Sequence, residues 1–189
     1  MTVFQNIRKG LIPARLSVDE VYALTEAGVF AENENIELIE GEIVPMAAAK
    51  ADWHEMMKAR LNRALVRVLP ESAWLYPEPS ITLSDTTLVE PDLVVLPSGS
   101  MTRRMRGPDL LLTIEVADSS LSYDLKVKAP LYATHGIRDY WVVDAIRKTI
   151  RVHRDPADGI YRDVEEFEAH DEVSALLLHD VSIRLDALD

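Results

Sequence analysis

Residues 110–144 decide the fold, and they read LLLTIEVADSSLSYDLKVKAPLYATHGIRDYWVVD. The apolar run at 110–116 is continuous enough for a strand in the middle of a sheet. A helix is predicted over 124–135, with Gly136 ending it, and the apolar run at 140–143 predicts another strand. A strand, a helix and a strand in this order indicate an α/β fold.

The chain on either side of this stretch supplies further helices and strands. Ser17 and Glu20 match a capping box, which predicts a helix that runs to about Gly28. Apolar residues recur at three- and four-residue spacing over 52–69 and predict an amphipathic helix, ended by Pro70. Strands are predicted at 36–39 and 43–46, a hairpin around Gly41, and at 80–83, 88–96 and 149–153. Because hairpins make antiparallel pairs, we expect one mixed central sheet flanked by helices, with the N-terminal helix and hairpin added.

The composition is that of an ordinary globular domain. The chain has 189 residues, 48% of them hydrophobic, and no cysteine. A chain of this length buries a sizeable core without disulfides, so we expect a single domain over 1–189. The lack of cysteine excludes thiol nucleophiles, cysteine-based zinc sites and redox pairs.

The N-terminal arm, residues 1–16, bears on location. It carries three basic residues but no apolar run of signal-peptide length. Nowhere do about 18 apolar residues run without interruption, as a membrane-spanning helix requires. We therefore expect a cytoplasmic protein that does not interact with a membrane.

The net charge of -12 is concentrated at one end of the chain. The segment 155–189, predicted as acidic C-terminal strands and tail, carries eleven acidic residues against Arg162 and Arg184, which leaves -9 there. Affinity for nucleic acid comes largely from Lys and Arg, so the total argues against DNA binding. That objection applies mainly to the C-terminal segment.

Two acidic residues lie at apolar strands, where a carboxylate requires an explanation. Asp92 follows Val89-Glu90-Pro91, and Glu115 lies inside 110–116. An ionised carboxylate that is buried without a partner is strongly unfavourable, so each lies in water, pairs with a base or holds a metal. Two converging carboxylates suit a hard divalent cation such as Mg²⁺. The alternative is that Asp92 lies in a solvated turn and Glu115 faces out of an edge strand.

The helix that follows the Glu115 strand adds an amine. Asp124, Lys128 and Tyr132 are four residues apart and share one face of the predicted helix. Lys126 points nearly the opposite way. The connecting loop is short, so the Lys128 face can return over the carboxylates. Pro130 removes a hydrogen bond inside a helix, so the helix is expected to kink there or to begin later.

Taken together, these segments resemble the Uma-two-type family of restriction endonucleases, a branch of the PD-(D/E)XK superfamily. The resemblance spans about residues 17–155. It is carried in chain order by Glu37-Leu38-Ile39-Glu40-Gly41, His54, Pro91-Asp92-Leu93, Glu115-Val116-Ala117-Asp118-Ser119-Ser120, the Asp124, Lys128 and Tyr132 series, and GIRDYWVVD at 136–144. Each piece is short, and the ordered series gives the resemblance its specificity.

The resemblance implies a restriction-endonuclease-like core in which Asp92 and Glu115 bind Mg²⁺ or Mn²⁺. It also implies a lysine that orients or activates the attacking water while neutralising the charge that develops on the phosphate. The wider superfamily places this lysine two residues after the glutamate, where the present chain has Ala117. Lys128 is expected to substitute for it from the helix.

Three further residues are candidates for supporting roles. His54 could contact the scissile phosphate or pair with an acid such as Glu37 or Glu40. The two glutamates could also add metal ligands. A lone helical histidine is more often structural, and Glu40 beside Gly41 is equally typical of an exposed turn.

A basic loop lies between the two strands that carry the acids. Arg103, Arg104 and Arg106 are flanked there by glycine, serine and proline. The arginine fork suits phosphate oxygens, so the loop could bind phosphates. A cluster of three charges is also typical of a solvated face.

The remaining chemistry-bearing residues are assigned to structure. The three tryptophans, Trp53, Trp74 and Trp141, are predicted to pack in the core or at an interface. No phosphate-cradling glycine loop and no G-x-S-x-G motif occurs, and His153, His170 and His179 are not spaced like a zinc set.

The function predicted on these grounds is Mg²⁺-dependent hydrolysis of phosphodiester bonds in DNA by an endodeoxyribonuclease. Two alternatives stay open. One is a catalytically inert binding or regulatory module of the same fold, and the other is a metal-dependent phosphoesterase that acts on small substrates. A homodimer is expected, because symmetric pairs are the commonest soluble assembly and cutting a duplex often needs two sites.

Overall fold

The computed structural model describes residues 15–29, 36–45 and 51–188. Its contacts divide the chain into two compact units, Met1–Ala48 with Thr82–Val89, and Ala49–Ile81 with Glu90–Asp189. Each unit is described by itself, and the single-domain organisation stays a prediction. Within the described residues, no helix is both long and apolar enough to cross a membrane.

The first unit contains a capped helix and a small antiparallel sheet. Helix α2 (Val18–Glu26) begins after Ser17, whose side chain and that of Glu20 form the predicted capping box. Strands β1 (Ile36–Ile39) and β2 (Glu42–Pro45) form the predicted hairpin, and Gly41 takes a φ of 85° in its turn. The sheet has the order β2-β1-β5-β4, with β4 at Ile81–Ser84 and β5 at Thr87–Val89. Met46, the last residue of the predicted second strand, lies outside the described residues.

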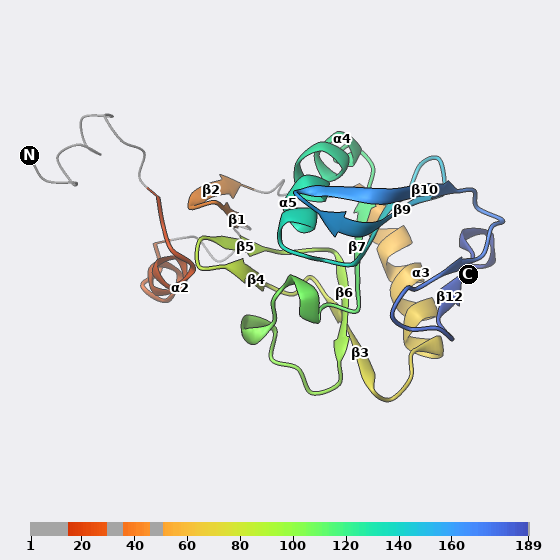
Figure 1. Ribbon diagram of the computed structural model, residues 1–189, viewed down its shortest axis with the longest axis horizontal. Coiled ribbons are helices and arrows are strands. Elements are labelled where there is room, and N and C mark those ends of the chain that lie inside the picture. Colours follow the sequence, from red (N-terminus) through yellow and green to blue (C-terminus); the bar gives the residue numbers. More distant parts are fainter. Residues whose placement is uncertain (1–14, 30–35, 46–50, 189) are drawn as a thin grey trace, which may run out of the picture. The chain divides into compact units, whose positions relative to one another are not determined.

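The second unit is built on a six-stranded mixed sheet of order β10-β9-β8-β7-β6-β3 (Figure 1). β7 and β8 pair in parallel, whereas every other neighbouring pair is antiparallel. The mixed sheet predicted from the sequence is therefore confirmed. The strands are β3 (Ala73–Pro77), β6 (Leu93–Pro97), β7 (Leu112–Ala117), β8 (Asp139–Asp144), β9 (Thr149–Ala157) and β10 (Ile160–Phe167).

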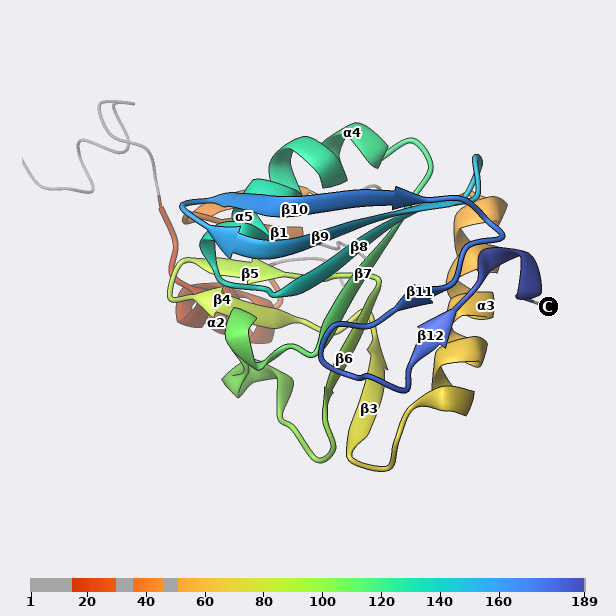
Figure 2. The same cartoon turned by 45° about the vertical axis from the view of Figure 1, so that its right-hand side comes forward.

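Helix α3 (Asp52–Val68) covers one face of this sheet, as Figure 2 shows. Its apolar residues Met57, Leu61 and Leu65 are buried in one cluster with Ile114 of β7 and Trp141 of β8. The same cluster takes in a two-stranded sheet from the C-terminal segment, β11 (Val173–Ser174) and β12 (Ser182–Ile183). Short 3₁₀ turns complete the unit at η1 (Thr102–Arg104), η2 (Gly107–Asp109) and η4 (Leu185–Ala187).

The helix between β7 and β8 differs from the regular helix predicted over 124–135. It consists of α4 (Leu121–Tyr123), a π-helical segment η3 (Asp124–Lys128) and α5 (Ala129–Thr134). The N–H of Ala129 donates to the carbonyl of Asp124, the five-residue spacing of a π-helix. Pro130 falls at the start of α5, where its missing N–H costs less. The helix therefore begins earlier than predicted and widens, rather than kinking, before the proline.

Candidate active site

Glu115 lies at the centre of a buried polar network. It is on β7, an interior strand, with 3% of its surface exposed. Its Oε1 accepts hydrogen bonds from Lys128 Nζ at 2.9 Å and from Tyr132 Oη at 2.8 Å. A carboxylate buried in this way is stable only because an ammonium and a hydroxyl satisfy it. The alternative of an edge strand with Glu115 facing solvent is therefore wrong.

Asp92 meets Glu115 across two neighbouring strands. β6 and β7 pair with Leu93 opposite Ile114, so continuing that register by one residue sets Asp92 opposite Glu115. The backbone N–H of Asp92 accordingly lies 3.4 Å from Glu115 Oε2. Asp92 Oδ2 accepts the N–H of Val116 at 2.9 Å, and the side chain is 8% exposed. Asp92 is thus buried, and the alternative of a solvated turn is wrong.

His54 connects the N-terminal turn of α3 to this pair. Its Nε2 lies 3.1 Å from Asp92 Oδ2, and its Nδ1 lies 3.2 Å from Glu55 Oε1. Both ring nitrogens therefore face carboxylates. His54 thus contacts Asp92 and Glu55, two acids other than Glu37 and Glu40, which the sequence suggested as examples of a partner.

The π-helical winding of η3 puts both Lys128 and Tyr132 on the sheet side. Asp124, Lys128 and Tyr132 are all buried, whereas Lys126 is exposed. Asp124 accepts a hydrogen bond from Ser120 Oγ at 2.7 Å, and its backbone carbonyl accepts one from Tyr140 Oη at 3.2 Å. These bonds fix the start of the helix, which places the Lys128 amine.

Two pKa shifts reflect the charge of this network. Burial raises the pKa of Tyr140 well above its ordinary value, and the negative charges of Glu115 and Asp124 raise it further. Tyr140 therefore stays protonated and keeps its hydrogen bond. Hydrogen bonds from Ser119 lower the pKa of Asp118, and attraction to His54 adds to that effect. Asp118 is consequently a further negative charge beside His54.

The donor chemistry fits a hard divalent cation held by two carboxylates. Among residues 15–29, 36–45 and 51–188, no group of three or more acidic and histidine side chains is arranged as a metal site. Mg²⁺ needs only one or two protein carboxylates, because it retains most of its waters. Asp92 and Glu115, joined directly across β6 and β7, are the residues that would hold it.

The comparisons with known proteins identify the family of the chain. A family model described as "Uma2: Putative restriction endonuclease" matches residues 18–186. This chain belongs to the Uma2 family. Among curated proteins, no relative matches.

Solved structures support the fold of this Uma2 protein. A crystal structure of a putative nuclease from Anabaena variabilis is 19% identical, with a TM-score of 0.71, and the match covers 92% of this chain and 97% of that one. Likeness at this identity shows the fold, so the predicted α/β architecture with its mixed sheet is confirmed. The type IIG restriction endonuclease BpuSI matches 58% of this chain and 12% of its own, at 16% identity and a TM-score of 0.40.

The other predicted site residues belong to other elements of the chain. Glu37 and Glu40 belong to the first unit, where Glu37 is buried in β1 and Glu40 is in the hairpin turn with a φ of 50°. Arg103, Arg104 and Arg106 are exposed on η1 and the residues after it. Roles for all five in ligand or phosphate binding stay predictions.

Sequence reasoning missed two acids of the second unit. Glu55 contacts the ring of His54, and Asp118 interacts with it electrostatically. Asp118 stands three residues after Glu115 in the motif that carries the family resemblance, and Glu55 is the neighbour of His54. Glu55 is adjacent in sequence to a recognised candidate and Asp118 is three residues from one, but only the folded chain shows that Glu55 contacts the imidazole and that Asp118 interacts with it electrostatically.

Proposed function

We propose that this Uma2 protein is a Mg²⁺-dependent endonuclease that hydrolyses phosphodiester bonds in DNA. The observation that carries the proposal is the direct linkage of Asp92, Glu115 and Lys128 in one buried network. Stability alone rarely favours such a group, because a buried ion pair is often no better than apolar packing. Perturbed or buried charges of this kind cluster at functional sites.

The roles follow from the contacts of each side chain. Asp92 and Glu115 hold the cation, and His54 and Tyr132 orient these two carboxylates through the hydrogen bonds described. Lys128 lies beside Glu115 and neutralises negative charge that develops on the phosphate oxygens in the transition state. Mg²⁺, when bound, supplies an acidified water and further stabilises that charge.

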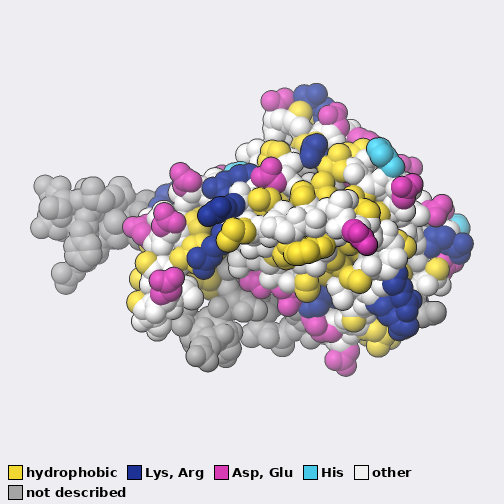
Figure 3. Space-filling model, turned by 90° about the horizontal axis from the view of Figure 1, so that it is seen from below, with side chains coloured by type: hydrophobic (Ala, Val, Ile, Leu, Met, Phe, Trp, Pro, Cys, Tyr) yellow, Lys and Arg dark blue, Asp and Glu magenta, His cyan; other side chains and the backbone are white. Residues whose placement is uncertain are grey.

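The acidic total of the chain does not prevent an encounter with DNA. On the face that Figure 3 shows, Lys and Arg side chains gather in several small groups among acidic and apolar ones. In the C-terminal segment, Glu166 is paired with Arg147 and Arg151. Arg103, Arg104 and Arg106 are proposed to add phosphate contacts, and a homodimer is proposed to present two sites to a duplex.

The experiment that tests the proposal is cleavage of supercoiled plasmid and of short labelled oligonucleotides with Mg²⁺, Mn²⁺ or EDTA. Wild-type protein should cut only with a divalent ion, and Asp92→Asn should not cut. Lys126→Met, which removes an exposed charge from the same helical segment, serves as the matched control and should cut like wild type. Cleavage by Asp92→Asn at the wild-type rate would refute the proposal.

The same assay separates the two alternatives. A phosphoesterase for small substrates would hydrolyse a small phosphodiester such as bis-p-nitrophenyl phosphate but leave polymers intact. An inert module would hydrolyse neither, and its stability would not respond to Mg²⁺.

A further inference from the structure

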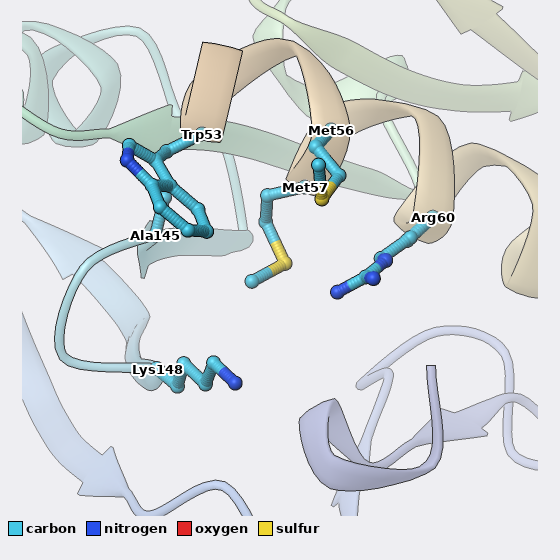
Figure 4. A pocket seen from close by; sticks show the side chains of 6 residues that line it. All are labelled: Trp53, Met56, Met57, Arg60, Ala145 and Lys148. Carbon is cyan, nitrogen blue, oxygen red and sulfur yellow. The ribbon is translucent and has the colours of Figure 1, made fainter. Parts of the chain in front are cut away.

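The start of α3 and the turn between β8 and β9 enclose a pocket of about 220 Å³ that the roles above do not use. Its lining consists of Trp53, Met56, Met57, Arg60, Ala145 and Lys148. All six belong to the second unit. Figure 4 shows the Trp53 ring beside Ala145 and the Met57 thioether directed into the pocket. The cationic ends of Arg60 and Lys148 reach toward the pocket from other sides.

Exposure of the aromatic side chain is the first unusual feature of this pocket. Trp53 is 61% exposed and Met56 is 44% exposed, although the sequence predicts Trp53 in packing. Trp53 is therefore not in the core, because the buried face of α3 is formed by His54, Met57, Leu61 and Leu65 instead. The predicted alternative, packing at an interface, stays a prediction. A large ring held at the surface beside a hollow is a stacking platform for a flat ligand.

The charges of the lining are the second feature. Arg60 and Lys148 are both cationic, and no acidic residue lines the pocket, in a chain whose net charge is -12. The turn that carries Lys148 is held in place, since Asp144 Oδ1 accepts the N–H groups of Ile146 and Arg147. An ammonium and a guanidinium beside an aromatic ring match a base with its phosphates.

The backbone connects the lining of the pocket to residues around the proposed catalytic carboxylates. Trp53 and His54 are consecutive, and His54 contacts Asp92. On the sheet, the N–H of Ala145 donates to the carbonyl of Ala117, two residues beyond Glu115 on β7.

From these observations we infer that the pocket binds an unpaired nucleobase of a single DNA strand. The inference rests on the proposed function for its substrate class. The base stacks on Trp53, and Arg60 and Lys148 contact the flanking phosphates. The volume suits one ring system, as it is below the roughly 300–1,000 Å³ of pockets that enclose larger ligands. A base inside a duplex is already stacked on its neighbours, so the nucleotide bound in the pocket is one that is unpaired, at an end or in an opened stretch of the DNA.

The test is binding of a fluorescein-labelled twelve-nucleotide oligo(dT) in EDTA, followed by fluorescence anisotropy. Trp53→Ala should weaken binding roughly tenfold or more, as loss of one stacked base does, while Trp53→Phe should stay within a few-fold of wild type. Lys148→Met should lower the slope of log K against log salt by about 0.7, as expected for one phosphate contact on a single strand. Trp74→Ala is the matched control, because Trp74 is 52% exposed on β3 but does not line the pocket. It should bind like wild type.

Three outcomes would overturn the inference. One is Trp53→Ala binding as tightly as wild type, and another is wild type failing to bind the oligonucleotide. The third is a wild-type dimer in sedimentation velocity that Trp53→Ala dissociates without any change in oligonucleotide binding, which would assign the pocket to a second copy.

Cleavage is measured separately, so the two proposals can fail independently. If Trp53→Ala loses oligonucleotide binding while the wild-type protein never cuts DNA, the base-binding role of the pocket is supported and the endonuclease proposal is refuted. If the wild-type protein cuts DNA with a divalent metal and Trp53→Ala binds the oligonucleotide as before, the endonuclease proposal is supported and the base-binding role of the pocket is refuted. Because Trp53 is mostly exposed, the variant should keep its unfolding midpoint within a few degrees, which the same samples check.

Discussion

The Lys128 ammonium lies 2.9 Å from the Glu115 carboxylate, with only 6% and 4% of the two side chains exposed. Neither charge can be solvated by bulk water, so each depends on the other and on the hydroxyl of Tyr132. A phosphate and a cation that enter this site would compete for charges that already neutralise one another. The folded site thus already contains the negative group that would bind the cation and the positive group that would face the phosphate.

Removing one member of this pair should destabilise the fold. Lys128→Met leaves an unpaired buried carboxylate and should lower the free energy of unfolding by about 3–5 kcal/mol. The double variant Glu115→Gln with Lys128→Met removes both charges and should recover much of that loss. Urea unfolding followed by circular dichroism measures both. Equal stability of wild type and Lys128→Met would mean that the pair is not buried in solution.

Loss of the Tyr132 hydroxyl should reduce activity as well as stability. Tyr132→Phe deletes the hydrogen bond to Glu115 Oε1, so stability should fall by about 1.5–3 kcal/mol, and the metal-dependent cleavage rate should drop. The matched control is Tyr161→Phe, which deletes the bond from Tyr161 Oη to the Ile137 carbonyl. The control should lose stability but not cleavage, and equal cleavage rates for the two variants would contradict a role for Tyr132.

Divalent cations should stabilise the folded protein. A ligand that binds only the native state at 100 times its dissociation constant adds about 2.7 kcal/mol. Thermal unfolding in saturating Mg²⁺ or Mn²⁺ should therefore shift upward by several degrees for wild type and not for Asp92→Asn. A shift of the same size in both proteins would place the binding elsewhere.

His153 should give the protein an acid-sensitive stability. It is 5% exposed between the rings of Tyr140 and Tyr161, and burial lowers its pKa from 6.5 to about 4. Between these values the unfolded chain binds a proton that the folded chain does not, so stability falls as the pH drops from about 6.5 to 4. The loss from this residue should reach roughly 3 kcal/mol.

The contribution of His153 can be isolated by substitution. His153→Phe removes the titrating ring and should flatten that part of the pH dependence of urea unfolding. His170→Gln, at a side chain that is 75% exposed, is the control and should leave the dependence as it is in wild type. An unchanged slope in His153→Phe would show that other groups cause the acid sensitivity.

Local signals in the sequence predicted much of the fold. The Ser17 capping box, the hairpin at Gly41 and the helix over 52–69 all depend on neighbouring residues, and each is present. The meeting of Asp92 and Glu115 was also foreseeable, since both stand at apolar strands close in sequence. Lys128 contacts Glu115 as expected, while the catalytic roles of all three residues stay predictions.

The features that the sequence did not predict are those that depend on which elements become neighbours in the fold. Residues 88–96 are predicted as one strand, but they form β5 and β6, which belong to different sheets. The chain leaves the first of these sheets around Pro91. The π-helical winding of η3 has no periodic signature in five residues. Trp53 was assigned to packing because apolar character does not say which face of α3 meets the sheet.

The most direct test of the metal-dependent site is the anomalous difference density of a crystal soaked in Mn²⁺. The account predicts one peak between Asp92 and Glu115, with a carboxylate oxygen of each within about 2.5 Å of the ion. Peaks at other positions only, or no peak at Mn²⁺ concentrations that support cleavage, would contradict it.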